Sequence, residues 1–439
     1  MTPGARLQAA IELVDRIVES EAPADAVISS YLRERRYIGA GDRRDVIERT
    51  YVVLRRRAAL GWWIGRSGTG VEASGRTLII AALSLIEKWS GDRIAGSFDG
   101  GRYRPESLSK PERLLAQALE GEKIEHPDQP RSVRFEYPEW LEPNLLDAFG
   151  PRLEEEMSAL MVEAPLDLRV NLLKATRSQA RAALMQGGLE PAETPLSPWG
   201  LRLPSRVALG QNDAFQAGLI EVQDEGSQLI ALLTEAQPGM RVCDFCAGAG
   251  GKTLALAAAM ANKGHITACD VLPGRLDRSA VRLKRAGVHN VERVELDNER
   301  DPWVKKHKGR FDRVLVDAPC TGIGTWRRNP DAKWRLSPER LAELVQLQRR
   351  ILDSAARLVK PGGRLVYATC SLLPEENEIQ IRSFLGSHPE FTQMPIAEVW
   401  SAQLSAPVPT SAASLTLTPA SHGTDGFFLA VLERKALPA

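Results

Sequence analysis

Strand-like and helix-like segments alternate in the second half of the chain. Short apolar runs, typical of strands buried in a sheet, occupy residues 241–246, 265–270, 291–296, 311–316, 364–368 and 427–432. Helical patterns lie between them, over residues 252–261 and 274–286, from Ser337 to just before Pro361, and over residues 375–385. Strands that alternate with helices predict a mostly parallel sheet with helices on both faces, the α/β class.

The first 135 residues show a helical pattern alone. Apolar residues recur at helical spacing over residues 6–19, 42–60 and 77–89. Residues 90–111 are rich in Gly, Ser and charged residues, which predicts a loop. We therefore expect an all-α domain over residues 1–135.

A second, smaller α/β pattern lies between these two parts. Residues 167–173 alternate like a strand, capping-box spacing at Thr176 opens a helix, and residues 200–203 resemble a second strand. We expect a small α/β module over residues 136–235 and a larger α/β domain over residues 236–435.

Charge is nearly balanced over the whole chain. The 57 Lys and Arg residues exceed the 56 Asp and Glu residues by one, so any nucleic-acid site must be a local patch. Acidic residues near the N-terminus argue against a signal or transit peptide, and the apolar runs at 78–86 and 254–261 are too short to span a membrane. These features predict a cytoplasmic protein without membrane contact, and they indicate no obligate protein partner.

The five cysteines are few and odd in number, which argues against a disulfide scaffold. Cys243 and Cys246 form a lone CxxC pair, and both are expected within one strand, so no redox or metal motif is predicted there. The six histidines are scattered without an HExxH motif, and no metal site is expected.

A glycine loop follows the first strand of the larger domain. It reads Cys246-Ala-Gly-Ala-Gly-Gly-Lys252-Thr253, and its glycines allow a tight turn close to a ligand. A phosphate-binding P-loop fits the Gly-Lys-Thr end but requires glycine at the position of Cys246. The nicotinamide fingerprint fits Gly248 and Gly250 but requires glycine at Thr253. The S-adenosylmethionine loop of methyltransferases tolerates this spacing, and the loop alone leaves a plain strand-to-helix turn open.

Three aspartates close successive strands beyond this loop. Asp270 closes the second strand, where a carboxylate can accept both ribose hydroxyls of a nucleoside. Asp297 closes the third strand and could accept from an adenine amino group, and Asp317 closes the fourth. Because parallel strands end at one edge of a sheet, a nucleoside ligand beside the glycine loop is predicted.

Two cysteines also stand just past strand ends, Cys320 after Asp-Ala-Pro and Cys370 after Ala-Thr. A free thiol is only a few per cent ionised at neutral pH, and a helix terminus or a cationic ligand would increase its thiolate fraction. Their expected position on the same edge as the loop points to covalent catalysis beside a bound nucleoside cofactor. Cys243 and Cys269 are expected to be buried and inert.

These motifs together resemble one family. The Cys320 motif, the Cys370 motif and the glycine loop are similar, in order and spacing, to those of RNA 5-methylcytosine methyltransferases of the bacterial RsmB/Sun type. The resemblance covers about residues 210–433. It departs from the usual family loop at Gly248 and Ala249, where the family has Ala-Pro.

The resemblance implies a fold and a substrate. It implies a Rossmann-like class I methyltransferase sheet over residues 236–435, preceded by an all-α NusB-like RNA-binding domain over residues 1–135 and a small α/β RNA-recognition-like module over residues 136–235. The implied reaction is S-adenosylmethionine-dependent methylation of carbon 5 of a specific cytosine in RNA, through a covalent cysteine–cytosine adduct. The favoured substrate is 16S ribosomal RNA, and the alternative is the same chemistry on transfer RNA.

The resemblance also implies roles for the site residues. Cys370 would attack carbon 6 of the cytosine, Cys320 would assist product release, and Asp317 would hold the pyrimidine. Asp270 would bind the ribose, and Lys252 would pair with Asp317 or the cofactor carboxylate, or cap the site. The residues implied to bind the cofactor are Cys246, Ala247, Gly248, Ala249, Gly250, Gly251, Lys252, Asp270, Asp297 and Asp317.

Two basic segments that contain aromatic residues are candidate RNA contacts, because phosphate pairing combined with stacking suits splayed RNA. Residues 31–57 hold nine Arg against four Asp or Glu, with Tyr37 and Tyr51 between them. The second segment contains Trp326, Arg327, Arg328, Lys333, Trp334 and Arg335. Solvated helix faces would give the same patterns. The rival function classes are an NTPase, which the missing P-loop glycine disfavours, and an RNA-binding or assembly protein without catalysis.

Overall fold

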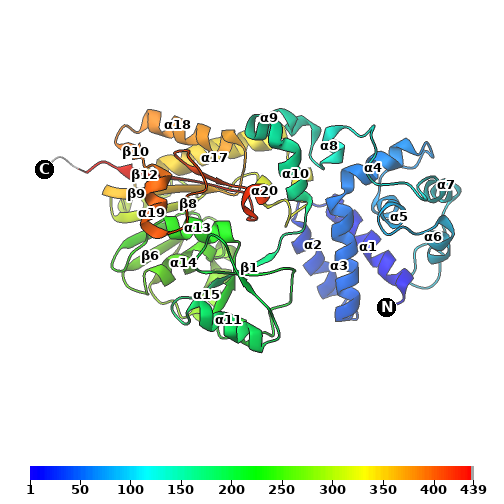
Figure 1. Cartoon of the computed structure of the whole chain (residues 1–439), viewed down its shortest axis with the longest axis horizontal. Coiled ribbons are helices and arrows are strands. Elements are labelled where there is room, and N and C mark those ends of the chain that lie inside the picture. The colour runs from blue at the N-terminus through cyan, green and yellow to red at the C-terminus, as the bar shows by residue number, and fades with distance from the viewer. Residues whose placement is uncertain (437–439) are drawn as a thin grey trace. The chain divides into compact units, whose positions relative to one another are not determined.

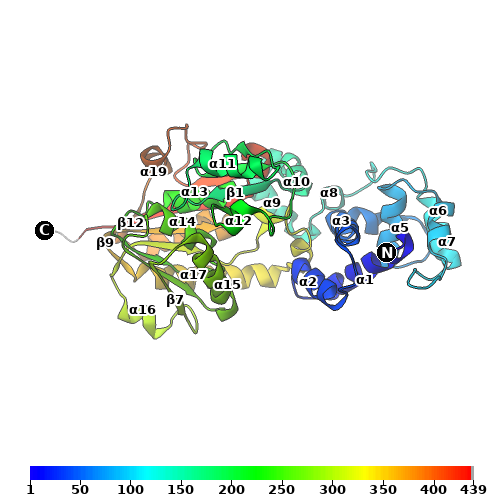
Figure 2. The same ribbon diagram turned by 90° about the horizontal axis from the view of Figure 1, so that it is seen from below.

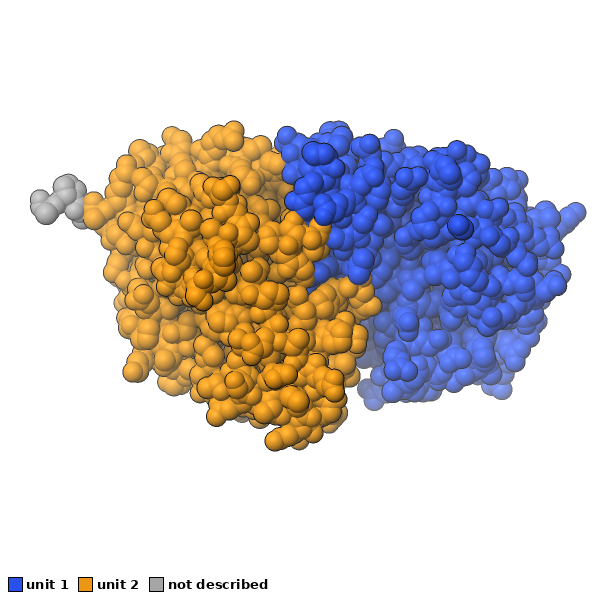
Figure 3. Space-filling model, viewed as in Figure 1, with its two compact units in different colours: residues 1–162, 326–337 blue, residues 163–325, 338–439 orange. Residues whose placement is uncertain are grey.

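The computed structural model describes residues 1–436, and the chain forms two compact units (Figure 3). Unit 1 contains residues 1–162 and 326–337, and unit 2 contains residues 163–325 and 338–439. Unit 1 therefore includes a short segment from the second half of the sequence. The three-domain division expected from the sequence remains a prediction.

Unit 1 is helical, as the apolar spacing predicted. Its helices are α1 (Pro3–Val18), α2 (Ala24–Glu34), α3 (Ala40–Arg55), α4 (Arg57–Arg66), α5 (Gly75–Leu85), α6 (Gly91–Ser97), α7 (Lys110–Ala118), α8 (Arg131–Arg134), α9 (Glu142–Phe149) and α10 (Leu153–Met161). The helix expected over 42–60 is broken at Arg56, whose φ of −117° lies outside the helical range. The loop expected over 90–111 contains α6, which Ser90 caps by accepting from a backbone N–H. No helix among residues 1–436 is long and apolar enough to cross a membrane.

The segment 326–337 is built into the interior of unit 1. Trp326 is fully buried, and the buried ammonium of Lys333 donates to the carbonyl oxygen of Glu136 over 2.9 Å. Arg327 is buried as well, and its carbonyl oxygen accepts from the guanidinium of Arg55 over 2.6 Å. These three side chains of the segment are not on the surface, which contradicts the expectation that they contact RNA.

Unit 2 begins with the small module, a sheet and two short helices. Its strands are β1 (Leu166–Val170), β2 (Ala192–Glu193), β3 (Gly200–Leu203) and β4 (Ile220–Val222), and its helices are α11 (Arg177–Gln186) and α12 (Asp213–Gln216). The sheet has the order β2-β3-β1-β4, and all its pairs are antiparallel. Thr176 and Gln179 form the predicted capping box at the start of α11.

The larger sheet of unit 2 has the order β10-β12-β9-β8-β5-β6-β7, with β11 paired to β12. Its strands are β5 (Arg241–Asp244), β6 (His265–Asp270), β7 (Val291–Glu295), β8 (Phe311–Asp317), β9 (Val359–Thr369), β10 (Phe391–Gln393), β11 (Leu415–Leu417) and β12 (Phe427–Arg434). The five strands β5 to β9 are parallel, and β12 runs antiparallel to β9. Because β6-β5-β8-β9 are contiguous, the segments that follow these strands emerge side by side at one edge.

Helices cover both faces of this sheet (Figure 1 and Figure 2). One apolar core packs α13 (Glu225–Leu233), α14 (Gly251–Ala259) and α19 (Ile396–Gln403) against the sheet, and α15 (Pro273–Ala286) packs beside α14. The other core packs α16 (Pro302–Lys306), α17 (Pro338–Ala356) and α18 (Glu378–Ser387) against the opposite face. The short α20 (Pro419–His422) precedes β12. The predicted Rossmann-like α/β fold is confirmed.

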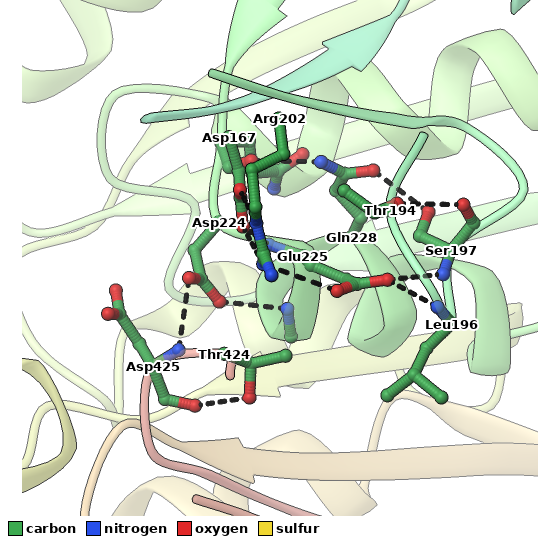
Figure 4. A network of polar contacts seen from close by, with 12 residues as sticks. Asp167, Thr194, Leu196, Ser197, Arg202, Asp224, Glu225, Gln228, Thr424 and Asp425 are labelled. Atoms are coloured by element: carbon green, nitrogen blue, oxygen red, sulfur yellow. Dashed lines mark hydrogen bonds and ion pairs between the residues drawn. The ribbon is translucent and has the colours of Figure 1, made fainter. Parts of the chain in front are cut away.

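A buried polar network joins the small module to the larger sheet (Figure 4). Arg202 of β3 donates to both carboxylate oxygens of Asp167 of β1, over 2.6 and 2.8 Å, and lies 3.3 Å from Glu225 at the start of α13. Burial raises the pKa of Glu225, and the N–H groups of Leu196 and Ser197 donate to its carboxylate. These contacts satisfy the buried charges and fix the module at the N-terminus of α13.

Candidate active site

The glycine loop needs glycine at two positions. Gly248 and Gly250 have φ values of +56° and +79°, in the left-handed region that favours glycine. A Cβ atom at Gly250 would lie 2.9 Å from the Cβ atom of Ser279 on α15, so the loop and this helix approach too closely for a side chain. Cys246 lies beyond the end of β5, which corrects the expectation that both cysteines of the CxxC pair are in the strand.

Asp270 holds the loop from the neighbouring strand. Its two carboxylate oxygens accept from the N–H groups of Gly248 and Leu272, each over 2.8 Å. Each oxygen keeps a second lone pair, so the carboxylate can still accept from a ligand hydroxyl. Val271 and Leu272 follow Asp270 and leave 49% and 47% of their surface exposed, although both are apolar. Sequence reasoning missed Val271 and Leu272. The sequence feature that could have identified them is two apolar residues directly after a carboxylate at the end of a strand.

Lys252 pairs with Asp317, which is one of the roles left open for this lysine. The Lys252 ammonium donates to the Asp317 carboxylate over 2.6 Å, and its side chain is 9% exposed while that of Asp317 is 32% exposed. The pair joins the first turn of α14 to the end of β8. The ammonium also lies 5.5 Å from the ring centre of Phe427.

A buried aspartate that the sequence reasoning missed lies beside this pair. Asp244, the last residue of β5, is fully buried, and burial raises its pKa to about 7. One carboxylate oxygen accepts from the Thr253 hydroxyl over 2.6 Å, and the other has no hydrogen-bond partner among the described residues. An aspartate in the last strand position before a glycine loop was the available signal.

The two strand-end cysteines are in contact. The Sγ atoms of Cys320 and Cys370 lie 3.3 Å apart, and both side chains are partly exposed. The parallel pairing of β8 with β9 sets Asp317 opposite Ala368, so the two motifs leave the sheet together. The hydrogen bond with Cys370, followed by burial, raises the pKa of Cys320 well above its usual value. Either thiol can donate to the sulfur of the other.

Buried polar groups fix the backbone around the two thiols. The carboxylate of Glu376 accepts from the N–H of Thr321 and from the amide of Gln348, each over 2.9 Å. The hydroxyl groups of Thr321 and Ser371 lie 3.2 Å apart. The N–H of Gly324 donates to the carbonyl oxygen of Cys370 over 2.9 Å, which joins the two cysteine loops directly. Local pattern gave no signal for this buried glutamate.

Asp297 stands apart from these contacts. It is exposed beyond the end of β7, and its N–H donates to the carboxylate of Asp301 over 3.0 Å. The structure thus brings Lys252 and Asp317 together, places the two thiols in contact, and ties the loop to Asp270. No cluster of His, Cys, Asp or Glu among residues 1–436 could hold a metal ion.

The residues at this edge fit a nucleoside with a cationic group. The ideal Cβ position of Gly248 has open space around it, so a ligand can approach the backbone there. Asp270 offers acceptors, and Val271 and Leu272 offer apolar surface. S-adenosylmethionine combines ribose, adenine and positive charge, so this set of groups suits it.

Two protein families match the chain. The 16S rRNA methyltransferase RsmB/F family matches residues 231–433, and the ferredoxin-like domain of RsmF/B-like methyltransferases matches residues 137–209.

Curated relatives match in sequence. The probable ribosomal RNA small subunit methyltransferase B of Synechocystis sp. is 36% identical over 318 residues, which cover 72% of this chain and 70% of that protein. The ribosomal RNA small subunit methyltransferase B of Yersinia pestis is 36% identical over 299 residues, which cover 68% of this chain and 66% of that protein.

Solved structures match in fold. The crystal structure of PH0851 gives a TM-score of 0.79 at 29% identity and covers 99% of both chains. A methyltransferase homolog protein from Pyrococcus horikoshii gives a TM-score of 0.60 at 29% identity and covers 69% of this chain and 97% of its own.

Proposed function

Because this chain belongs to the RsmB/F family of 16S rRNA methyltransferases, we propose that it methylates carbon 5 of a cytosine in 16S ribosomal RNA. S-adenosylmethionine is the methyl donor, and the reaction passes through a cysteine–cytosine adduct. One observation carries this proposal: the contact between Cys320 and Cys370, 3.3 Å apart at the ends of adjacent strands. Transfer RNA as the substrate of the same chemistry is the alternative.

The chain offers a complete set of groups for the methyl donor. The loop from Cys246 to Lys252 holds the methionine part, Asp270 accepts from the ribose, and Asp297 accepts from the adenine amino group. Val271 and Leu272 supply apolar contact for the adenine ring, since both are exposed beside Asp270. Bound S-adenosylmethionine supplies an electrophilic methyl group on a sulfonium.

Cys370 is the nucleophile. Its thiolate forms a bond to carbon 6 of the cytosine, and the electrons of the carbon 5–carbon 6 double bond make carbon 5 nucleophilic. Asp317, held by Lys252 over 2.6 Å, binds the pyrimidine at its ring nitrogen and exocyclic amine. The Cys320 thiol lies 3.3 Å from the Cys370 sulfur, in position to donate to it.

Cys320 then assists release. The hydrogen bond and the charge of Cys370 are two of the causes that raise the pKa of Cys320. Both disappear once Cys370 is bonded to carbon, so Cys320 ionises more readily at the stage where a base is required. Its thiolate takes the proton from carbon 5, the double bond re-forms, and Cys370 leaves as a thiolate.

RNA contacts are proposed for the exposed part of the first basic segment. Arg33, Arg36, Tyr37 and Arg44 are exposed around the end of α2 and the start of α3. Tyr51 is buried, with 9% of its surface accessible, so it is not available for stacking. Phosphate pairing by the arginines and stacking on Tyr37 would hold a splayed RNA segment.

The test is methyl transfer with the full chain. Labelled S-adenosylmethionine is incubated with 16S ribosomal RNA or transfer RNA, and 5-methylcytosine is identified after digestion. Cys370→Ala should abolish methyl transfer, and Cys320→Ala should accumulate a protein–RNA adduct that survives denaturing electrophoresis. Wild-type turnover in Cys370→Ala would refute the assignment of the nucleophile, and labelling of transfer RNA alone would favour the alternative substrate.

A further inference from the structure

Two arginines from outside the loop hold its backbone carbonyls. Arg282 of α15 donates to the carbonyl oxygen of Ala249 over 2.7 Å. Arg169 of β1, in the small module, donates to the carbonyl oxygen of Gly251 over 2.7 Å. A loop rich in glycine has many conformations available to it, so contacts that fix one carbonyl within it and one where it joins α14, at Gly251, restrict it strongly.

Glu221 connects these two arginines. It lies on β4, directly opposite Arg169 in the antiparallel pairing of β1 with β4. Its carboxylate lies 3.4 Å from the guanidinium of Arg282 and accepts from that of Arg285 over 2.7 and 2.8 Å. The module therefore supplies one loop contact directly and orients the arginine that makes the other.

Burial makes Arg169 costly to keep. It is 3% exposed, and burial lowers its pKa to about 10, partly offset by Glu221. Its guanidinium donates to the amide oxygen of Gln223 as well as to Gly251, while its Nε atom has no partner among the described residues. An apolar side chain would fill this site without the cost of burying a charge. Packing alone therefore does not explain why an arginine contacts the loop here.

A separate network already joins the module to α13. Asp167, Arg202 and Glu225 join the module to α13 through buried hydrogen bonds (Figure 4). The Arg169 and Arg282 contacts are directed at the cofactor loop instead.

We propose that Arg169 and Arg282 are positioning residues, through which the small module holds the cofactor loop in the conformation that binds the methyl donor. This inference rests on the proposed function. Loss of either contact would let the loop sample other conformations, and the methyl donor would then have to order it on binding. Because a hydrogen bond from a charged group to a carbonyl is worth enough to change affinity about tenfold or more, the affinity for the methyl donor should fall by roughly that factor.

The experiment compares variants of one helix. Arg282→Ala removes the contact with Ala249, Arg282→Lys keeps a donor, and Arg278→Ala removes an exposed arginine of α15 as the matched control. Calorimetry with S-adenosylmethionine gives the dissociation constant, methyl transfer gives KM for RNA, and thermal unfolding without ligand gives stability. We expect Arg282→Ala to weaken S-adenosylmethionine binding about tenfold with KM for RNA unchanged, Arg282→Lys to recover part of the loss, and Arg278→Ala to match wild type.

The outcomes separate this inference from the proposed function. Equal affinity of wild type and Arg282→Ala for S-adenosylmethionine would overturn the inference while leaving the function intact. The inference would also be overturned if Arg282→Ala weakened RNA binding and the stability of the protein without ligand as much as it weakened S-adenosylmethionine binding. That pattern would indicate a general structural role for Arg282. A wild-type protein that binds no S-adenosylmethionine would instead refute the proposed function. Arg169 is buried, so a variant such as Arg169→Lys can fail to fold. Arg282 is partly exposed, and its variants therefore provide the test.

Discussion

Replacing Asp244 with asparagine should stabilise this protein at neutral and alkaline pH. The carboxylate is fully buried at the end of β5, and only one of its oxygens has a hydrogen-bond partner among the described residues. Asn is nearly isosteric, and its amide oxygen can still accept from Thr253. The substitution therefore removes a buried charge without creating a cavity.

The magnitude follows from the pKa. Burial raises the pKa of Asp244 from 3.8 to about 7, and each pKa unit corresponds to about 1.4 kcal/mol, so ionising the folded protein costs about 4 kcal/mol. The unfolded chain loses its proton first as pH rises, so stability falls between about pH 4 and pH 7 and then levels off. Between pH 5 and pH 8 the ionisation of Asp244 lowers the free energy of unfolding of the wild type by roughly 2–3 kcal/mol. Asp244→Asn has no carboxyl group at this position, so it does not show this decrease.

Urea unfolding at pH 5 and pH 8 provides the assay, with hydrogen exchange of β5 reporting on unit 2. The stability advantage of Asp244→Asn over wild type should be larger at pH 8 than at pH 5 by that amount. An advantage that does not change with pH would refute the argument, because it would mean that the carboxyl has the same pKa in both states. A cationic ligand would favour the ionised carboxylate, so wild-type affinity for S-adenosylmethionine should rise toward pH 7 and the variant should lose this dependence.

Three further substitutions test other parts of the structure. Gly250→Ala would place a Cβ atom 2.9 Å from Ser279 at a residue whose φ is +79°. The free energy of S-adenosylmethionine binding, measured by calorimetry, should weaken at least as much as the free energy of unfolding of unit 2. Lys333→Met removes the ammonium whose charge lowers the pKa of the buried Glu136 carboxyl, and it should destabilise unit 1 by about 3–5 kcal/mol in urea unfolding, whereas adding Glu136→Gln should recover part of that loss. Arg33→Ala and Arg36→Ala should each weaken RNA binding in filter assays and make it less sensitive to salt, and an unchanged salt slope would exclude phosphate contacts there.

Strands of both sheets were predictable because they carry strong local signals. The apolar run that ends at Asp270 coincides with β6, and the short run over residues 200–203 coincides with β3. Each is bounded by a turn residue or a charge, so both ends were marked in the sequence. Helix α2 was missed, because its buried side chains, Ala24, Ile28 and Tyr31, are too few to give a clear helical period.

The position of the two thiols at one edge of the sheet was also predictable, since both cysteines follow parallel strands, but their direct contact was not. The buried contacts of Arg169 and Lys333 were not predictable, because their partners are distant in the chain. Arg169 contacts a residue 82 positions away, and Lys333 contacts one 197 positions away. Composition marked Lys333 as part of a basic, aromatic segment, but composition cannot distinguish a cation that faces RNA from one that faces a buried glutamate.

This difference bears on how the site is divided between its parts. The groups proposed to perform chemistry, Cys320, Cys370 and Asp317, all come from the ends of β8 and β9. The groups that restrict the glycine loop come from β6, α15 and the small module, through Asp270, Arg282 and Arg169. A substitution in the module can therefore change methyl-donor binding without touching any group that reacts, because the loop conformation depends on contacts that the methyltransferase strands alone do not supply.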